Sequence, residues 1–359
     1  MQILPYDVSR CVTLLFMMNK FIMLDDIEDD ASDELPRVED SATFGFEVYV
    51  LRQIANPFRL SWVLIRLGHE PFVPVKFYSP LALLGWHTPI LVYPNVFQYV
   101  YYTIRELGLW RVISTGVFAS ACMDFISQIF HRVSRYRSIV WDQWLKNPQG
   151  MKAAYTDLAI DTRTHKRIEP FQVETQMGDA QPVLFLTMLF EATSIRAWEV
   201  LITHPFYVVM VRQVAALIGG EQQYNWFPVA VRSVYRETGL LGFFQGLVPR
   251  LASEVITTVV YYSICRILRR WIFGRNKKRA GAVNIIQVLT FFALRNYVYS
   301  LELAGCIMTV RGSKLAGAAE ANSFSGWRDC ERFLVRSGQS NRGWFPFLRS
   351  HIQPKDLPD

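Results

Sequence analysis

The fold is constrained most strongly by a signature that occurs twice. The segments Asn56–Arg59 (NPFR) and His204–Tyr207 (HPFY) each end a long apolar run. Each is followed further along the chain by Arg-Glu-x-Gly, at residues 105–108 and 236–239. The second copy continues into a Gly-aromatic turn at residues 242–246 and then into another apolar run. One repeating unit is therefore an apolar helix with Pro at its end, an amphipathic segment, a turn and a second apolar helix.

A third copy of this unit is partial. Residues 335–338 (VRSG) match the amphipathic end of the second copy without its Glu, and Asn341–Phe345 occupies the place of the Gly-aromatic turn. Residues 346–359, which follow, are short and polar, whereas the second copy continues into an apolar helix. The sequence predicts about two and a half repeats, with five membrane-spanning helices and no sixth.

The repeats divide the chain into six segments. We expect an acidic N-terminal tail with a short apolar run (1–41), a first repeat (42–132), a polar loop (133–181), a second repeat (182–273), a truncated third repeat (274–345) and a C-terminal tail (346–359). Runs long enough to span a bilayer lie at about 43–67, 109–131, 182–217, 247–272 and 283–310.

Composition supports a membrane protein. Of the 359 residues, 51% are hydrophobic and 14% aromatic, which exceeds an average soluble domain. The net charge is +7, although residues 25–40 are strongly acidic, so the remainder is more basic than the total suggests. Basic residues interleaved with long apolar runs favour an anionic lipid surface over nucleic acid. The basic cluster at 269–279 fits such a surface or a solvated linker.

Enzymatic chemistry finds little support in the sequence. The five Cys and six His show no metal-ligand spacing, and we find no phosphate-binding loop, dinucleotide fingerprint or nucleophile elbow. We therefore expect no enzyme activity, no cofactor, no metal and no disulfide framework.

Every predicted span nevertheless contains an ionisable residue. A charge at the bilayer centre costs at least about 2.5–3.5 kcal/mol, so such residues should face a polar interior or reach an interface. Arg52, Arg59 and Arg66 are seven apart and share one helix face. Because Arg66 lies near the helix end, we expect it to snorkel to the interface.

We predict that the charged residues of the spans line one polar groove. Arg196 and Glu199 are three apart and could simply pair, and Arg295 and Glu302 are seven apart on one face. The groove candidates are Arg52, Arg59, Asp124, Glu191, Arg196, Glu199, Arg212, Glu254, Arg295 and Glu302.

Four stretches carry a resemblance to a known family: Asn56–Pro74, His204–Gly220, Tyr235–Ala252 and Trp327–Gly343. The chain resembles the mitochondrial carrier homolog family, the divergent outer-membrane branch of the mitochondrial solute carrier superfamily. The resemblance implies an all-α, multi-pass protein of the mitochondrial outer membrane, built as a carrier-like bundle of threefold pseudo-repeats. It also implies insertion of tail-anchored and other α-helical membrane proteins.

The carrier signature itself is degenerate. Ordinary carriers have Pro-x-acid-x-x-base in each repeat, and the acids and bases form ion pairs that close a gate. Here the acid and base positions are taken by other residues, and Arg59 even has the opposite sign. The remaining signature positions are Pro57, Trp62, Pro205, Tyr207, Met210, Gly246, Pro249 and Arg250, with Val298, Ser300 and Leu303 in the third repeat. Solute antiport by the usual mechanism is therefore not expected.

A carrier bundle without its sixth helix should open sideways to lipid, as a polar groove within the membrane. We expect the groove to lower the cost of moving a hydrophilic segment while an apolar helix slides into lipid. The expected partners are membrane lipids and client α-helical proteins. The alternatives are phospholipid scrambling, a residual solute carrier, or a docking receptor for apoptotic or metabolic partners through residues 25–40 and 132–181.

Overall fold

The computed structural model of the chain describes residues 55–77, 90–130, 182–268, 280–345 and 349. All of these belong to one compact unit, Ala55–Asp359. Arg52, the acidic segment at 25–40, the polar loop at 133–181 and the basic cluster at 269–279 lie outside the described residues.

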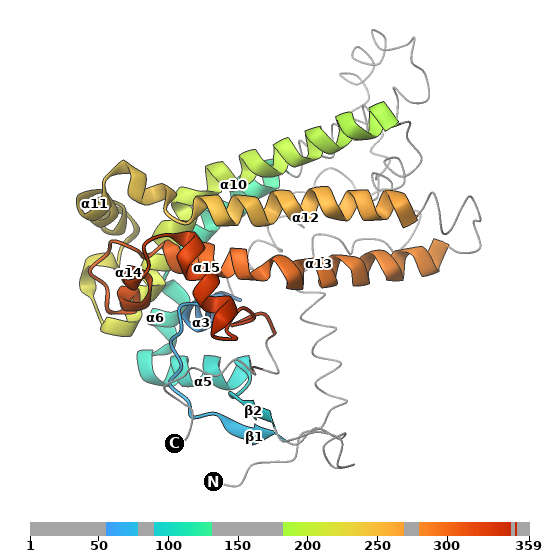
Figure 1. The fold of residues 1–359 in the computed structure, drawn as a ribbon. Helices are drawn as coiled ribbons and strands as arrows, with labels where there is room; N and C mark the ends of the chain where they lie inside the picture. The colour runs from blue at the N-terminus through green and yellow to red at the C-terminus, as the bar shows by residue number, and fades with distance from the viewer. Residues whose placement is uncertain (1–54, 78–89, 131–181, 269–279, 346–348, 350–359) are drawn as a thin grey trace, which may run out of the picture. The chain divides into compact units, whose positions relative to one another are not determined.

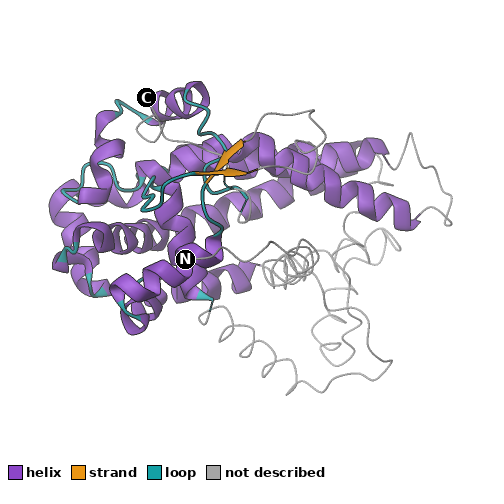
Figure 2. Ribbon diagram, turned by 90° about the horizontal axis from the view of Figure 1, so that it is seen from below, coloured by secondary structure: helices purple, strands orange, loops and turns teal. Residues whose placement is uncertain are grey.

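The described chain is mostly helical (Figures 1 and 2). The α-helices are α3 (Asn56–Arg66), α5 (Val96–Leu107), α6 (Leu109–Ser114), an unlabelled helix at 117–130, α10 (Pro182–Gly219), α11 (Phe227–Thr238), α12 (Leu247–Ile267), α13 (Ala280–Met308), α14 (Ala319–Ser323) and α15 (Trp327–Arg336). Three 3₁₀ helices join them: η1 (Gln222–Tyr224), η2 (Leu240–Phe244) and η5 (Ala316–Ala318). Strands β1 (Val75–Phe77) and β2 (Ile90–Val92) pair antiparallel, with Lys76 opposite Leu91.

The three long helices α10, α12 and α13 lie side by side, with α12 between the other two (Figure 1). The core lies where the C-terminal parts of α10 and α13 meet α3 and the short helices. Val208 and Val211 of α10 and Leu303 of α13 are fully buried there. These apolar residues therefore hold the C-terminal parts of α10 and α13 together.

The two signature prolines do not end their helices. Pro205 lies inside α10, which continues to Gly219, and Pro57 lies in the first turn of α3. Proline is tolerated in a first turn because its missing N–H would have no intrahelical partner there. The expectation that a Pro ends an apolar helix is therefore wrong for Pro205, whereas the apolar run before Pro57 lies outside the described residues.

The predicted amphipathic segments form three short helices with similar ends. α5, α11 and α15 each have an Arg in the last turn. Each is followed within two residues by a Gly with positive φ: Gly108, Gly239 and Gly338. Glycine is favoured at these positions because a Cβ strains a left-handed backbone.

Cys330 offers a simple test of how α15 packs. Its side chain is fully buried in the core, and burial raises the pKa of the thiol to about 12. The thiolate is the reactive form, so at pH 8 we expect alkylation about a thousandfold slower than for an ordinary thiol. The rate should rise about tenfold per pH unit until it approaches that pKa.

The measurement is iodoacetamide labelling of a variant whose other four Cys are Ser, followed by mass spectrometry. The same variant unfolded in guanidinium chloride is the control, and it should label at the ordinary rate. Equal rates in the folded and unfolded protein would show that α15 does not protect Cys330.

Candidate functional site

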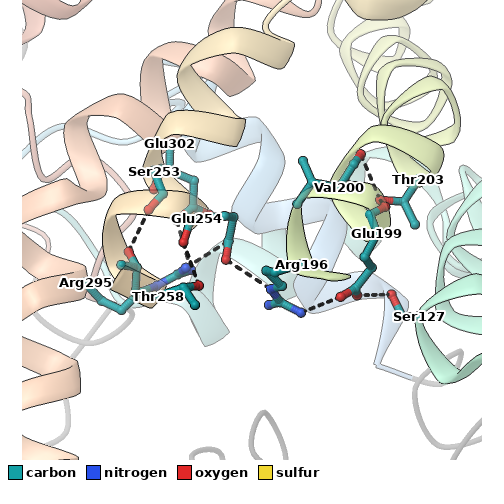
Figure 3. Close-up of polar contacts among 11 residues, drawn as sticks. Ser127, Arg196, Glu199, Val200, Thr203, Ser253, Glu254, Thr258, Arg295 and Glu302 are labelled. Atoms are coloured by element: carbon teal, nitrogen blue, oxygen red, sulfur yellow. Dashed lines mark hydrogen bonds and ion pairs between the residues drawn. The ribbon is translucent and has the colours of Figure 1, made fainter. Parts of the chain in front are cut away.

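A continuous series of ion pairs connects α10, α12 and α13 (Figure 3). On α10, Arg196 Nη1 donates to Glu199 Oε2 at 2.8 Å, and Arg196 Nε donates to Glu254 Oε2 of α12 at 3.3 Å. The other carboxylate oxygen of Glu254 accepts from Arg295 Nη1 of α13 at 3.0 Å. Glu254 therefore bridges two guanidinium groups from two different helices.

The series continues from α13 to α3. Arg295 Nη2 donates to Glu302 Oε2 at 3.0 Å, and Glu302 Oε1 lies 3.1 Å from Arg66 Nη1 of α3. Arg66 Nε also donates to the hydroxyl of Tyr299 at 3.2 Å. We call the six residues Glu199, Arg196, Glu254, Arg295, Glu302 and Arg66 the ion-pair network.

The helix at 117–130 contacts this network through Ser127 and contacts α3 separately through Asp124. Ser127 Oγ donates to Glu199 Oε1 at 2.8 Å, and Asp124 Oδ2 accepts from Arg59 Nη2 of α3 at 3.4 Å. Polar contacts thus pass from α3 to this helix, to α10, α12 and α13, and back to α3. Each of the five helices that carry the predicted spans contributes a side chain to this closed circuit.

The ion-pair network is balanced in charge and largely shielded from solvent. It has three carboxylates and three guanidinium groups, and the exposed fraction of the side chain is 11% for Glu199 and 16% for Glu254 and Glu302. Arg196 is the most accessible member, with 40% of its side chain exposed. Removing any one member would destabilise the fold, because it would leave a buried charge without its partner. The network also places positively and negatively charged groups, all able to form hydrogen bonds, inside an apolar bundle.

Several sequence predictions meet in this network. Arg196 and Glu199 form the ion pair that their three-residue spacing allows, and Arg295 and Glu302, which were expected to share one helix face, contact each other. Arg59, whose sign is reversed relative to carriers, contacts the carboxylate of Asp124.

Arg66 does not snorkel away from the bundle. It is the last residue of α3, but α13 packs against this end, so the guanidinium meets Glu302 and lies 5.4 Å from the centre of the Tyr299 ring. The prediction of an interfacial Arg66 was wrong, because a helix end need not lie at a membrane surface.

Two further predicted groove residues lie on α10. Glu191 precedes Arg196 by five residues on this helix. Arg212 is fully buried near the C-terminal end of α10. Its Nε donates to the Thr309 carbonyl and its Nη2 to Gln245 Oε1, both at 3.0 Å, and Glu237 lies 3.6 Å away. Arg212 therefore joins α10 to the ends of α13 and α11.

Signature positions other than Arg59 make hydrogen-bond, aromatic and apolar contacts. The Trp62 indole N–H donates to the Gly343 carbonyl. The Arg250 guanidinium lies 4.0 Å from the centre of the Tyr207 ring. Met210 is buried, and a Cβ on Gly116 would lie 3.1 Å from its Cγ. Pro249, in the first turn of α12, is also buried.

Ser127 and Tyr299 were not predicted as part of the site. Ser127 is three residues after Asp124, so helical spacing places both on one face. Tyr299 lies four residues after Arg295 and three before Glu302, so the same spacing places it on their face, although its contact with Arg66 depends on the approach of α3. Within the described ranges, no group of three or more His, Cys, Asp or Glu side chains is placed to hold a metal ion.

Length and composition mark two described helical stretches as candidate membrane spans, Leu109–Phe130 and Phe185–Gly219. They coincide with the predicted second and third spans. Five spans, the threefold repeat and an open groove remain predictions.

Sequence comparison defines the class of protein to which this fold and site belong. The family model of the mitochondrial carrier protein matches residues 184–276, which contain α12, all but the first two residues of α10, and half of the ion-pair network. The chain is therefore a mostly helical protein with a mitochondrial carrier domain, and a mitochondrial membrane is its expected location.

Individual relatives identify the family within this class of carrier proteins. "Mitochondrial carrier homolog 2" of Mus musculus is 30% identical over 300 residues, which are 82% of this chain and 89% of the relative. The protein of the same name from Homo sapiens is 24% identical over 299 residues, with the same coverage. "Mitochondrial carrier homolog 1" of Mus musculus is 22% identical over 321 residues, covering 81% of this chain and 72% of the relative. The chain belongs to the mitochondrial carrier homolog family, as its sequence motifs predicted.

Proposed function

We propose that this protein inserts tail-anchored and other α-helical proteins into the mitochondrial outer membrane. The observation that carries the proposal is the ion-pair network, which joins four helices, with the helix at 117–130 attached through Ser127. In the proposed architecture, a carrier-like bundle of threefold pseudo-repeats has five spans and a laterally open polar groove. Neither an enzyme activity nor a cofactor is required.

The network suits the transfer of a hydrophilic segment across hydrocarbon. An uncompensated charge at the bilayer centre costs at least about 2.5–3.5 kcal/mol. Guanidinium and carboxylate groups alternate along the network, so a client group of either sign would find a partner of opposite charge. Arg196, the most exposed member, is the best placed for first contact.

The outer surface of the same helices suits lipid. Leu186, Phe190, Trp198 and Ile202 of α10 recur at four- or eight-residue intervals and are each more than 40% exposed. Phe125 on the helix at 117–130 is 63% exposed. A helix with an apolar outer stripe and a polar inner contact matches a membrane span that lines a path.

The signature positions argue against a conventional antiporter. Trp62, Tyr207 and Met210 cannot form the acid–base pairs that an alternating gate would break and re-form. Phospholipid scrambling is a second candidate, because adjacent groups of opposite sign would also fit a zwitterionic headgroup. The docking receptor would act through residues outside those that the structure describes.

Reconstitution tests the proposal. Purified protein in liposomes should increase the membrane insertion of a tail-anchored substrate, measured by protease protection, and no gain over empty liposomes would overturn it. A dithionite assay with fluorescent lipid on the same vesicles reports scrambling. Scrambling without insertion would favour the second candidate.

Substitutions test whether the client's hydrophilic segment crosses the membrane along the ion-pair network. Arg196→Gln should slow insertion about fivefold, as expected for the loss of ~1 kcal/mol of interaction with the client. Arg232→Gln is the matched control, because Arg232 is exposed on α11. Arg59→Glu and Glu302→Lys should also alter insertion. Equal rates for Arg196→Gln and Arg232→Gln would contradict this role.

A further inference from the structure

The turn after α15 lies between the ends of α3 and α13. The Trp62 indole of α3 donates to the Gly343 carbonyl, and the Tyr299 hydroxyl of α13 donates to the Arg342 carbonyl at 2.9 Å. Gly343 has a φ of +80°, and a Cβ there would lie 3.2 Å from both Arg66 Cγ and Tyr299 Oη. Only a residue without a side chain fits this approach unstrained.

Arg342 binds the C-terminal end of α3. Its Nε and Nη2 donate to the Arg66 carbonyl at 3.1 and 2.7 Å, which satisfies a backbone acceptor that the helix leaves open. Its Nη1 contacts Glu320 at 3.2 Å and Gln339 at 2.9 Å, and the residue is 1% exposed. Arg66 therefore belongs to two systems, because its side chain lies in the ion-pair network and its carbonyl is held by Arg342.

A second contact lies further along the chain at Arg349. Its side chain forms a buried ion pair with Glu70, which follows α3, and donates to the Pro94 carbonyl at 2.9 Å. Its carbonyl accepts from the backbone N–H of Tyr93 at 2.8 Å. The guanidinium also lies 5.4 Å from the centre of the Tyr99 ring.

We propose that residues 339–345 form a clasp that holds α3 against α13 and limits how far these two helices can separate, and that Arg349 anchors the chain beyond the clasp to Glu70. Arg342 and Arg349 are positioning residues: they act on the polar path through α3 and not by contact with a client. The clasp follows from the contacts alone, whereas its effect on insertion rests on the proposed function. Because Arg66 links both systems, loss of the clasp should loosen the Arg66–Glu302 contact first.

Hydrogen–deuterium exchange in lipid nanodiscs tests the clasp without any insertion assay. Arg342→Met should raise the exchange rate of the α3 amides about tenfold or more by local opening, with α11 and α12 unchanged. Glu320→Gln, which removes the carboxylate that Arg342 contacts, should shift exchange in the same direction by a smaller factor. Arg332→Met is the control, because Arg332 is exposed on α15.

Each outcome is decisive. Unchanged exchange in α3, or an equal rise in all helices, would overturn the clasp. A selective rise in α3 with an unchanged insertion rate would retain the clasp and reject its control of the path. Absence of insertion by the unaltered protein would reject the proposed function but leave the exchange result valid.

Discussion

Replacement of Glu254 by Gln is expected to lower the free energy of unfolding by about 3–5 kcal/mol, the cost of removing one partner from a buried ion pair. Glu254 contacts Arg196 at 3.3 Å and Arg295 at 3.0 Å, and its side chain is 16% exposed. The neutral amide would leave two guanidinium groups without their shared carboxylate. Glu254 is the only acid of the ion-pair network that contacts guanidinium groups from two other helices. Glu199 and Glu302 each have an arginine partner on their own helix.

Chemical denaturation in detergent micelles, followed by tryptophan fluorescence, measures this loss. Glu106→Gln is the matched control, since Glu106 is exposed on α5, and it should change stability by less than about 0.5 kcal/mol. Adding Arg196→Gln to Glu254→Gln should increase the loss, because Arg196 still pairs with Glu199 in the single variant and its removal leaves that carboxylate without a guanidinium. A Glu254→Gln effect no larger than that of the control would show that the network does not hold the helices together.

Gly246→Ala is expected to be the most damaging single-methyl change. Gly246 has a φ of +78° at the start of α12, and an added Cβ would lie 2.2 Å from the backbone oxygen of Gly305 in α13. The obstacle is backbone, so it cannot rotate away, and α12 and α13 would have to separate. Left-handed strain and the clash together should cost about 4 kcal/mol or more.

Gly239→Ala separates these two contributions. Gly239 has a φ of +70°, but a Cβ there meets nothing within 4 Å. Its cost should therefore be backbone strain alone, about 1–3 kcal/mol for a conformation essentially confined to glycine. Thermal unfolding of both variants in the same detergent provides the comparison. Equal losses would mean that the close approach of Gly246 to Gly305 does not form in the folded protein.

Local patterns predicted a substantial part of the candidate site. The three-residue spacing of Arg196 and Glu199 and the seven-residue spacing of Arg295 and Glu302 are properties of a single helix, so sequence alone could place the members of each pair on one face. The same reasoning identified Glu254 as an isolated charge in an apolar run. It could not assign its partners, because these come from two other helices.

Charges near helix ends were harder to predict. Arg66 has the spacing and position of a snorkelling residue, yet α13 and the turn at Gly343 surround it. Arg212 was predicted to share the groove because it lies in an apolar span, yet its partners are at the far end of α10 from Arg196. In both cases the neighbouring element decided the outcome.

The sequence by itself determined the apolar helices, the positions of the short amphipathic helices and the membership in the carrier homolog family. These features depend on the spacing of residues within one segment, and helical periodicity can be recognised directly in the sequence. The tertiary structure alone decided which charges meet, that Arg66 links the ion-pair network to the clasp, and that Gly246 and Gly343 are needed for close approach. Those features depend on distances between helices, and such distances are determined by how the helices pack, which no single segment encodes.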